Sequence, residues 1–174
     1  AGAPLSPASF RTRPKLVVVL VIDQFRADYL TRFESRFLPA RSKNGTIGGL
    51  RYLMESGAYY PFGKFDLLQC MTGPGHATIL TGSYPYNSGI ALNHWFDVER
   101  NEGVYCAGDL AEGAVGPGGL AAPNSNLGTS PRNLIGTTYG DELKMAGFPS
   151  RVVSIAIKDR AAIFLGGHLA DLAL

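Results

Sequence analysis

The sequence is poor in the residues that build disulfide frameworks and zinc fingers, with two cysteines and three histidines among 174 residues. Cys70 and Cys106 match neither the spacing of a zinc finger nor that of a redox motif. One disulfide and two separate thiols both remain open for this pair. At 45% hydrophobic and 17% charged residues, the chain is predicted to form a globular domain with its own core.

Long apolar runs and blocks of like charge are also absent from the sequence. The longest uncharged apolar stretch, residues 16–22, is far shorter than the roughly 20 residues that cross a bilayer, so no transmembrane helix is predicted. The net charge is +2 and is dispersed, which indicates neither a nucleic-acid nor a membrane partner. The small, Pro-containing residues 1–9 are typical of the segment that follows a cleaved signal peptide, which predicts a periplasmic or secreted protein.

The hydrophobic pattern favours an α/β fold. Residues 15–22 (KLVVVLVI) form a continuous apolar run, as in a strand that is covered on both faces of a parallel sheet. Residues 25–33 then carry apolar side chains at helical spacing, and residues 151–157 (RVVSIAI) predict a second buried strand. We therefore expect a mostly parallel central sheet flanked by helices. The apolar residues 166–174 predict a domain that is incomplete at its C-terminus.

Glycines and prolines mark the expected helices and loops. A helix is predicted at residues 49–56, ending at Gly57. A second is predicted with Pro74 at its first helical position, Thr72 at or just before its start, and Gly82 at its end. Another is predicted after Thr137 and Thr138 and ends at Gly147. Residues 1–14 are expected to be a flexible segment, and residues 15–174 to belong to one domain. Its Gly- and Pro-rich residues 108–131 are expected to form a surface excursion.

Asp23 and Thr72 stand where an α/β protein places ligands. Asp23 follows the first predicted strand, so it either caps the next helix or offers a carboxylate to Zn²⁺ or Mg²⁺. Thr72 precedes Gly73 at the start of a predicted helix, where it is either a cap or a nucleophile. The helix dipole and N–H groups favour an alkoxide and a bound phosphate, provided that Gly73 lets the substrate approach closely.

Two cations follow the second predicted strand. Lys158 and Arg160 flank Asp159 and are either a solvated charge cluster or a phosphate-binding pair. Arginine offers a planar fork to two oxygens and lysine a compact charge, which together suit a dianionic monoester. Asn93 serves either in a turn or as an amide donor to another phosphate oxygen. The three histidines form no ligand set by their spacing, and structural roles are favoured.

These segments together resemble the alkaline phosphatase superfamily. The similarity includes Asp23 after the first strand, the Thr72-Gly73-Pro74-Gly75-His76 element, Asn93 and the Lys158-Asp159-Arg160 element. Its closest resemblance is to the zinc-dependent phosphate monoesterase branch that uses a threonine nucleophile, with similarity also to the type I phosphodiesterase/nucleotide pyrophosphatase family. It extends over nearly everything after the first dozen residues.

The resemblance implies a role for each matched residue. Asp23 and Thr72 would be zinc ligands, Thr72 would also attack phosphorus and form a phosphothreonine intermediate, and the phosphate would be held by Gly73, Asn93, Lys158 and Arg160. The family completes its two zinc sites with later Asp and His residues, so the chain is expected to need a further C-terminal portion. The substrate implied is a small phosphate ester, with no nucleic-acid or membrane partner.

Three other functions remain as alternatives. Phosphodiesterases on the same scaffold resemble the Asp23, Thr72 and Asn93 portions but generally lack the Lys158/Arg160 pair. A catalytically silent α/β binding domain, or an inactive fragment, would keep the frame without the chemistry. Sulfatases derive their nucleophile from Cys or Ser in a different motif, and Cys70 lies two residues from the required position.

Overall fold

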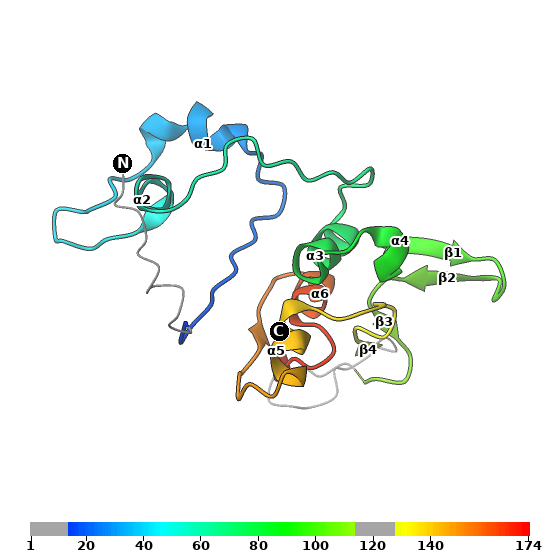
Figure 1. Ribbon diagram of the computed structural model, residues 1–174. Coiled ribbons are helices and arrows are strands. Elements are labelled where there is room, and N and C mark those ends of the chain that lie inside the picture. The colour runs from blue at the N-terminus through cyan, green and yellow to red at the C-terminus, as the bar shows by residue number, and fades with distance from the viewer. Residues whose placement is uncertain (1–13, 114–127) are drawn as a thin grey trace. The chain divides into compact units, whose positions relative to one another are not determined.

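The computed structural model describes residues 14–113 and 128–174 (Figure 1). The chain divides into two compact units, residues 1–65 and residues 66–174. The predicted flexible segment lies outside the described residues except for Pro14, and so do residues 114–127 of the predicted excursion. The assignment of residues 15–174 to a single domain stays a prediction.

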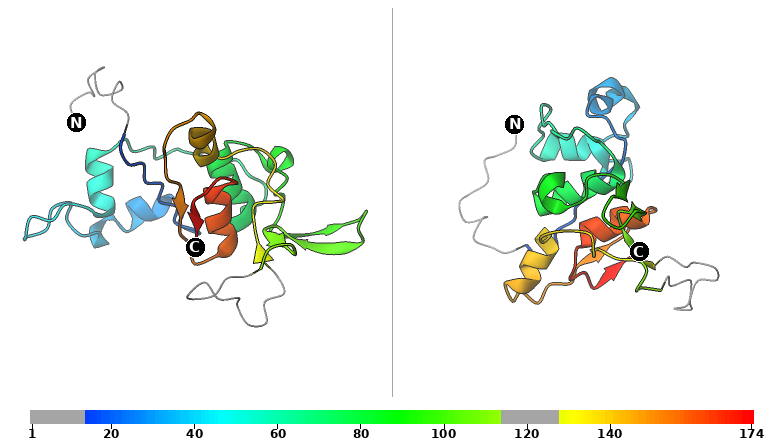
Figure 2. Two further views of the ribbon diagram at one scale, coloured as in Figure 1. Left: turned by 90° about the horizontal axis from the view of Figure 1, so that it is seen from below. Right: turned by 90° about the vertical axis from the view of Figure 1, so that its right-hand side faces the viewer.

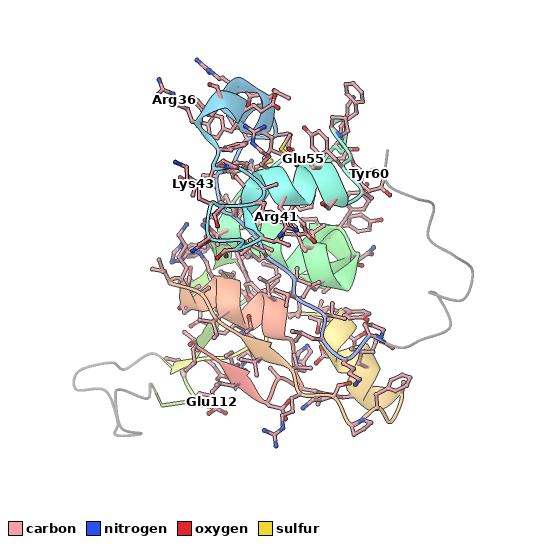
Figure 3. All side chains as sticks on the ribbon, turned by 90° about the vertical axis from the view of Figure 1, so that its left-hand side faces the viewer. Arg36, Arg41, Lys43, Glu55, Tyr60 and Glu112 are labelled. Atoms are coloured by element: carbon pink, nitrogen blue, oxygen red, sulfur yellow. The ribbon has the colours of Figure 1, made fainter. Side chains whose placement is uncertain are left out.

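The first unit contains three short helical elements, which are α1 (Asp28–Arg32), the 3₁₀-helix η2 (Glu34–Arg36) and α2 (Gly49–Ser56). Helix α2 has the predicted bounds and ends at Gly57, whose N–H donates to the carbonyl of Leu53 over 2.9 Å. The helical spacing predicted after residue 25 corresponds to α1, where Tyr29 stands between the rings of its neighbours Phe25 and Phe33. Figure 3 shows charged side chains such as Lys43 and Glu55, both exposed, projecting from this unit.

The strand predicted at residues 15–22 is not formed, and this prediction is wrong for the structure. Val18 is 76% exposed and Leu20 is 73% exposed. A strand of a parallel sheet needs neighbouring strands for its backbone groups and helices over both faces. Among the described residues 14–65, the only β-pairing is an isolated bridge between Arg41 and Ile47. The residues of this apolar run favour a strand, but no partner strand among the described residues pairs with them.

The second unit contains the remaining elements. In chain order they are α3 (Thr72–Thr81), α4 (Pro85–Ser88), β1 (His94–Asp97), β2 (Glu102–Tyr105), β3 (Gly108–Asp109), β4 (Gly128–Thr129), α5 (Tyr139–Met145), β5 (Val153–Ser154), α6 (Asp159–Gly166) and β6 (Leu172–Ala173). The strands of the described residues form three two-stranded sheets. The pairs β1–β2 and β3–β4 are antiparallel, whereas β5–β6 is parallel. Strand β5 lies inside the predicted strand 151–157 but is shorter.

Helices α3 and α6 pack side by side and form the centre of this unit (Figures 1 and 2). Phe164 of α6 and Ile90, after α4, are fully buried. The rest of the buried cluster consists of Ala77, Cys106, Ala107, Leu134 and Ile163, with Trp95 and Tyr105 packed against it. Burial of these side chains supplies the hydrophobic free energy that fixes the first turn of each helix in place. The two cysteines are free thiols, with Cys70 exposed and Cys106 buried.

Helix boundaries follow the predicted signals with two exceptions. Helix α3 ends at Gly82, which has a φ of 63°, as the sequence predicts. Thr138 caps α5, as predicted, and the structure shows that it does so through a capping box with Asp141. Pro74 occupies the third helical position rather than the first. This costs no hydrogen bond, because N–H groups in the first turn have no intrahelical acceptor and proline lacks an N–H. Helix α6 was not predicted.

The two ends of the predicted excursion meet at one point. Gly108 of β3 pairs with Thr129 of β4, and Asp109 pairs with Gly128. Asp109 also accepts hydrogen bonds from the Ser130 hydroxyl over 2.6 Å and from Arg132 over 2.9 Å. These contacts hold together the two ends of the predicted excursion. Across the described residues, no helix is both long enough and apolar enough to cross a lipid bilayer.

Candidate active site

Thr72 is the first residue of α3 and is buried, with 7% of its surface exposed. The extended backbone of Met71 caps the helix, so Thr72 is not the N-cap that the simplest interpretation of the sequence predicts. Its carbonyl accepts a hydrogen bond over 2.8 Å from Nδ1 of His76, one turn later. His76 therefore fixes the first turn of the helix, in keeping with a structural role. The Thr72 hydroxyl lies at the positive end of the α3 dipole.

Gly73 holds Asn93 against the start of α3. Its backbone N–H donates to Oδ1 of Asn93 over 2.7 Å. A Cβ on Gly73 would lie 3.0 Å from that oxygen and 3.1 Å from Sγ of Cys106. The glycine thus makes room for these two side chains. Its predicted role in letting substrate approach closely stays a prediction. Because Oδ1 faces Gly73, the Nδ2 group remains the donor end of Asn93.

Lys158 reaches Thr72 from the other helix. It is the N-cap residue of α6, and its Nζ donates to Oγ1 of Thr72 over 3.2 Å. The two residues are 86 positions apart in the sequence. They meet because α3 and α6 start at the same place in the second unit. A positive charge next to the hydroxyl oxygen favours negative charge on that oxygen.

Arg160 lies in the first turn of α6 and is held by Tyr105 of β2. Its Nη1 donates to the Tyr105 hydroxyl oxygen over 3.2 Å, and that hydroxyl donates to Oδ1 of Asp159 over 2.6 Å. The backbone N–H of Arg160 also donates to this carboxylate oxygen over 2.7 Å. The Nε atom of Arg160 is buried and makes no hydrogen bond within the described residues. The Lys-Asp-Arg element is therefore part of an ordered network with Tyr105.

Burial and hydrogen bonding shift the pKa values of Tyr105, Arg160 and Cys106. Burial, followed by the hydrogen bond to Asp159, raises the pKa of Tyr105 to about 12. The hydrogen bond to Tyr105 raises the pKa of Arg160 further above its already high value. Burial raises the pKa of the neighbouring Cys106 thiol to about 11. Tyr105 and Cys106 are consequently neutral and Arg160 is charged well into alkaline solution.

The backbone around Asn93 is tied to the same network. The N–H of Cys106 donates to the carbonyl of Asn93 over 2.9 Å, and the rings of His94 and Tyr105 contact each other in a tilted arrangement, with 4.8 Å between their centroids. His94 and Tyr105 are partners in the β1–β2 register. The hairpin therefore places Asn93 and Tyr105 on adjacent strand ends, next to the starts of α3 and α6.

Of the six residues predicted for the site, Thr72, Gly73, Asn93, Lys158 and Arg160 come together in the second unit. Asp23 belongs to the first unit and is exposed in a tight turn, in which the N–H of Phe25 donates to the carbonyl of Ile22 over 3.3 Å. The next residue, Gln24, has a φ of 61°, which is uncommon for a residue with a side chain. The convergence of Asp23 with Thr72 stays a prediction.

Sequence reasoning missed Tyr105 and the part played by Asp159. In the sequence, Asp159 stands between two cations and shows no role of its own. Tyr105 carries no motif, and its distance from Arg160 in the sequence is 55 residues, so no spacing rule connects the two. The start of α6 did have a signal, since Asp159 precedes an apolar run that ends at Gly166 and Gly167.

A cluster of metal ligands does not form among the described residues, since no three His, Cys, Asp or Glu side chains there come together. Catalytic zinc sites use about three protein ligands per ion.

A family model described as type I phosphodiesterase / nucleotide pyrophosphatase matches residues 17–155, which is most of the chain. The chain belongs to this family. The match spans Asp23, Thr72, Gly73 and Asn93 and ends just before the Lys-Asp-Arg element. The family resemblance predicted from the sequence is confirmed.

Several similar proteins are named alkaline phosphatases. The chain is 44% identical over 160 residues to alkaline phosphatase PhoV of Synechococcus elongatus, covering 91% of this chain and 27% of that protein. It is 41% identical over 157 residues to alkaline phosphatase PafA of Elizabethkingia meningoseptica, covering 90% of this chain and 27% of that protein. The chain thus spans about a quarter of the length of these relatives.

A crystal structure of alkaline phosphatase PafA matches the fold with a TM-score of 0.81 and 38% identity. The match covers 93% of this chain and 29% of that chain. The predicted fold class, α/β of the alkaline phosphatase type, is therefore confirmed, although the sheets of the described residues are small.

Proposed function

We propose that the full-length protein hydrolyses phosphate monoesters, with Thr72 as its nucleophile. The observation that carries this proposal is the 3.2 Å contact between Nζ of Lys158 and the Thr72 hydroxyl. It is supported by 44% and 41% identity to two proteins named alkaline phosphatases. A threonine hydroxyl beside a cation and at a helix start has the surroundings that an attacking oxygen needs.

The reaction proceeds in two displacements on phosphorus. Oγ1 of Thr72 gives up its proton and forms a bond to phosphorus as the bond to the ester oxygen breaks. The leaving alkoxide takes up one proton and departs as the alcohol, so that no net proton is released. Water then attacks the phosphothreonine, which releases inorganic phosphate and restores the hydroxyl. In both steps negative charge develops next to the Lys158 ammonium, which stabilises it more than it stabilises the neutral hydroxyl.

Three side chains hold the phosphate oxygens. Lys158 supplies a compact charge, Arg160 a planar guanidinium, and Asn93 the amide donor that its contact with Gly73 leaves available. Two cations match the two charges of a monoester dianion better than the single charge of a diester. This charge balance supports a monoesterase, and Gly73 contributes through the position that it gives to Asn93.

Zinc is the cofactor that we propose, with Asp23 and Thr72 as the ligands from this chain. When bound, zinc acts as a Lewis acid that stabilises an alkoxide ligand. The other ligands are proposed to lie in the part of the relatives' length that this chain does not span. We also propose a periplasmic or secreted location, which the composition of residues 1–9 supports.

Phosphodiester hydrolysis is the second candidate, and the name of the matching family model favours it. A diester carries one negative charge on its non-bridging oxygens, so it would draw less benefit from the second cation. The ratio of activities toward 4-nitrophenyl phosphate and bis(4-nitrophenyl) phosphate separates the two functions. A ratio well above one supports the monoesterase, and a ratio well below one supports the diesterase.

The Thr72→Ala and Thr72→Ser variants of the full-length protein test the nucleophile. With the wild-type protein, acid quenching during turnover should trap phosphate on the peptide that contains Thr72, and mass spectrometry locates it. Thr72→Ala should lose both this adduct and turnover, while Thr72→Ser should keep a detectable adduct because it retains a hydroxyl. Unchanged turnover by Thr72→Ala would refute the assignment. A wild-type protein without phosphate release would support the silent binding domain instead.

A further inference from the structure

We infer that Tyr105 is a positioning residue that sets the orientation of the Arg160 guanidinium toward phosphate. The inference rests on the proposed phosphate site and assigns a role to a residue that the sequence did not single out. Tyr105 is the one side chain among the described residues that accepts a hydrogen bond from the Arg160 side chain. The other polar contact of this side chain is a long ion pair of 3.9 Å with Asp159.

The direction of each hydrogen bond follows from the chemistry of the groups. A carboxylate accepts and a guanidinium donates, so the single Tyr105 proton goes to Asp159 and its oxygen lone pair faces Arg160. The short 2.6 Å bond to Asp159 thereby fixes the rotation of the hydroxyl. Tyr105 thus connects the anion and the cation of the Lys-Asp-Arg element and keeps them from closing into a direct bidentate pair.

The tyrosine is itself held rigidly. Its ring packs against the buried cluster of the second unit and lies in tilted contact with the ring of His94. Its backbone carbonyl accepts a hydrogen bond from Nδ2 of Asn133 over 3.3 Å. A rigid support that carries a fixed hydroxyl is what a guanidinium needs if its remaining N–H groups are to meet phosphate oxygens in one orientation.

The Tyr105 hydroxyl is expected to affect the binding of phosphate more than the chemical steps at phosphorus. With Tyr105 in place, Nη1 of Arg160 is anchored, and the orientation of the planar fork is already selected before substrate arrives. Without the hydroxyl, Arg160 gains the freedom to pair directly with Asp159, which would neutralise the charge meant for phosphate. Loss of one hydrogen bond to a charged group corresponds to about a tenfold loss of affinity.

The test is a double-mutant cycle in the full-length protein, with Tyr105→Phe, Arg160→Ala and the double variant. The binding of inorganic phosphate is measured by titration calorimetry, and the hydrolysis of 4-nitrophenyl phosphate is measured in parallel. Tyr105→Phe keeps the ring in the core, so its melting temperature should stay close to that of the wild type. The matched control is Tyr60→Phe, which makes the same change at a residue that is 79% exposed (Figure 3).

We expect Tyr105→Phe to weaken phosphate binding about tenfold in the wild-type background and by less than twofold in the Arg160→Ala background. In the kinetics, the loss should fall mainly on KM. Additive losses, full phosphate affinity in Tyr105→Phe, or no phosphate binding by the wild type would each overturn the inference. A wild-type protein that binds phosphate but hydrolyses no monoester would refute the proposed function alone.

Discussion

The ammonium group of Lys158 lies 3.2 Å from the hydroxyl oxygen of Thr72, although 86 residues separate them in the chain. Each residue stands at the start of a helix, and the two helices pack against each other. The contact therefore depends on the packing of α3 on α6 and not on any local motif. It joins the proposed nucleophile to the proposed phosphate-binding element.

Removal of the Lys158 charge is expected to impair monoester hydrolysis. Lys158→Ala in the full-length protein should lower kcat/KM for 4-nitrophenyl phosphate about 100-fold, the usual effect of losing one donor to developing negative charge. Activity toward bis(4-nitrophenyl) phosphate should fall less, because a diester carries less charge. Steady-state kinetics on both substrates measure this difference.

The control for this variant is Lys43→Ala, which removes an exposed cation in the first unit (Figure 3). It should leave both activities unchanged. Equal losses toward monoester and diester in Lys158→Ala would argue against the proposed match between its charge and a dianion.

A side chain at Gly73 is expected to displace Asn93. The new Cβ of Gly73→Ala would stand 3.0 Å from Oδ1 of Asn93 and 3.1 Å from Sγ of Cys106, and Cys106 is buried and held by its backbone. Such overpacking costs about 1–3 kcal/mol of the free energy of unfolding. The activity should fall together with it, because Asn93 loses its position. Urea denaturation and kinetics on the same preparation measure the two effects.

Gly103→Ala is the matched control, because a Cβ there meets no atom within 4 Å. It should change the free energy of unfolding by less than about 0.5 kcal/mol, as surface substitutions usually do. A Gly73→Ala variant as stable and active as this control would show that the contact with Asn93 is dispensable.

Asp141 is expected to make the second unit sensitive to acid. Burial alone would raise its pKa, but the backbone N–H groups of Thr138, Leu169 and His168 outweigh burial and lower the pKa below the usual 3.8. Because the folded-state pKa is depressed, the stabilisation is fully present above the unfolded pKa. It is lost as pH falls through about 4 toward the folded pKa.

Asp141→Asn should therefore destabilise the protein by about 2 kcal/mol at pH 7, since it weakens a capping box and several hydrogen bonds to a buried charge. Its deficit relative to the wild type should shrink as the pH drops below 4. Urea midpoints from pH 7 to pH 3 test this. Asp66→Asn, at an exposed position, should show no such pH-dependent difference, and a constant deficit in Asp141→Asn would contradict the linkage.

Local sequence signals predicted the helices better than the strands. Gly57 and Gly82 end their helices where the sequence predicts, and Thr138 begins α5 through a capping box, because each signal acts within one helical turn. The strand expected at residues 15–22 failed because β-structure needs a partner that the run itself does not contain.

The residues of the candidate site likewise differ in whether the sequence indicates them. Residue chemistry marked Thr72, Asn93, Lys158 and Arg160 as candidates with structural alternatives, and the resemblance to the family implied their roles in phosphate chemistry. Tyr105 was not recognisable, since its role comes from two hydrogen bonds to residues more than 50 positions away. The role of Asp159 as the acceptor for the Tyr105 hydroxyl was likewise not apparent from its place between two cations.

Residue type and short spacing were enough to predict the ends of several helices, the family and the kinds of side chain available for chemistry. The tertiary structure alone decided that Lys158 faces Thr72, that Asn93 is turned by the N–H of Gly73, and that Arg160 rests on Tyr105. Burial of a shared core brings the starts of α3 and α6 close to the end of the β1–β2 hairpin, where these contacts form. No short sequence pattern predicts contacts between segments so far apart in the chain.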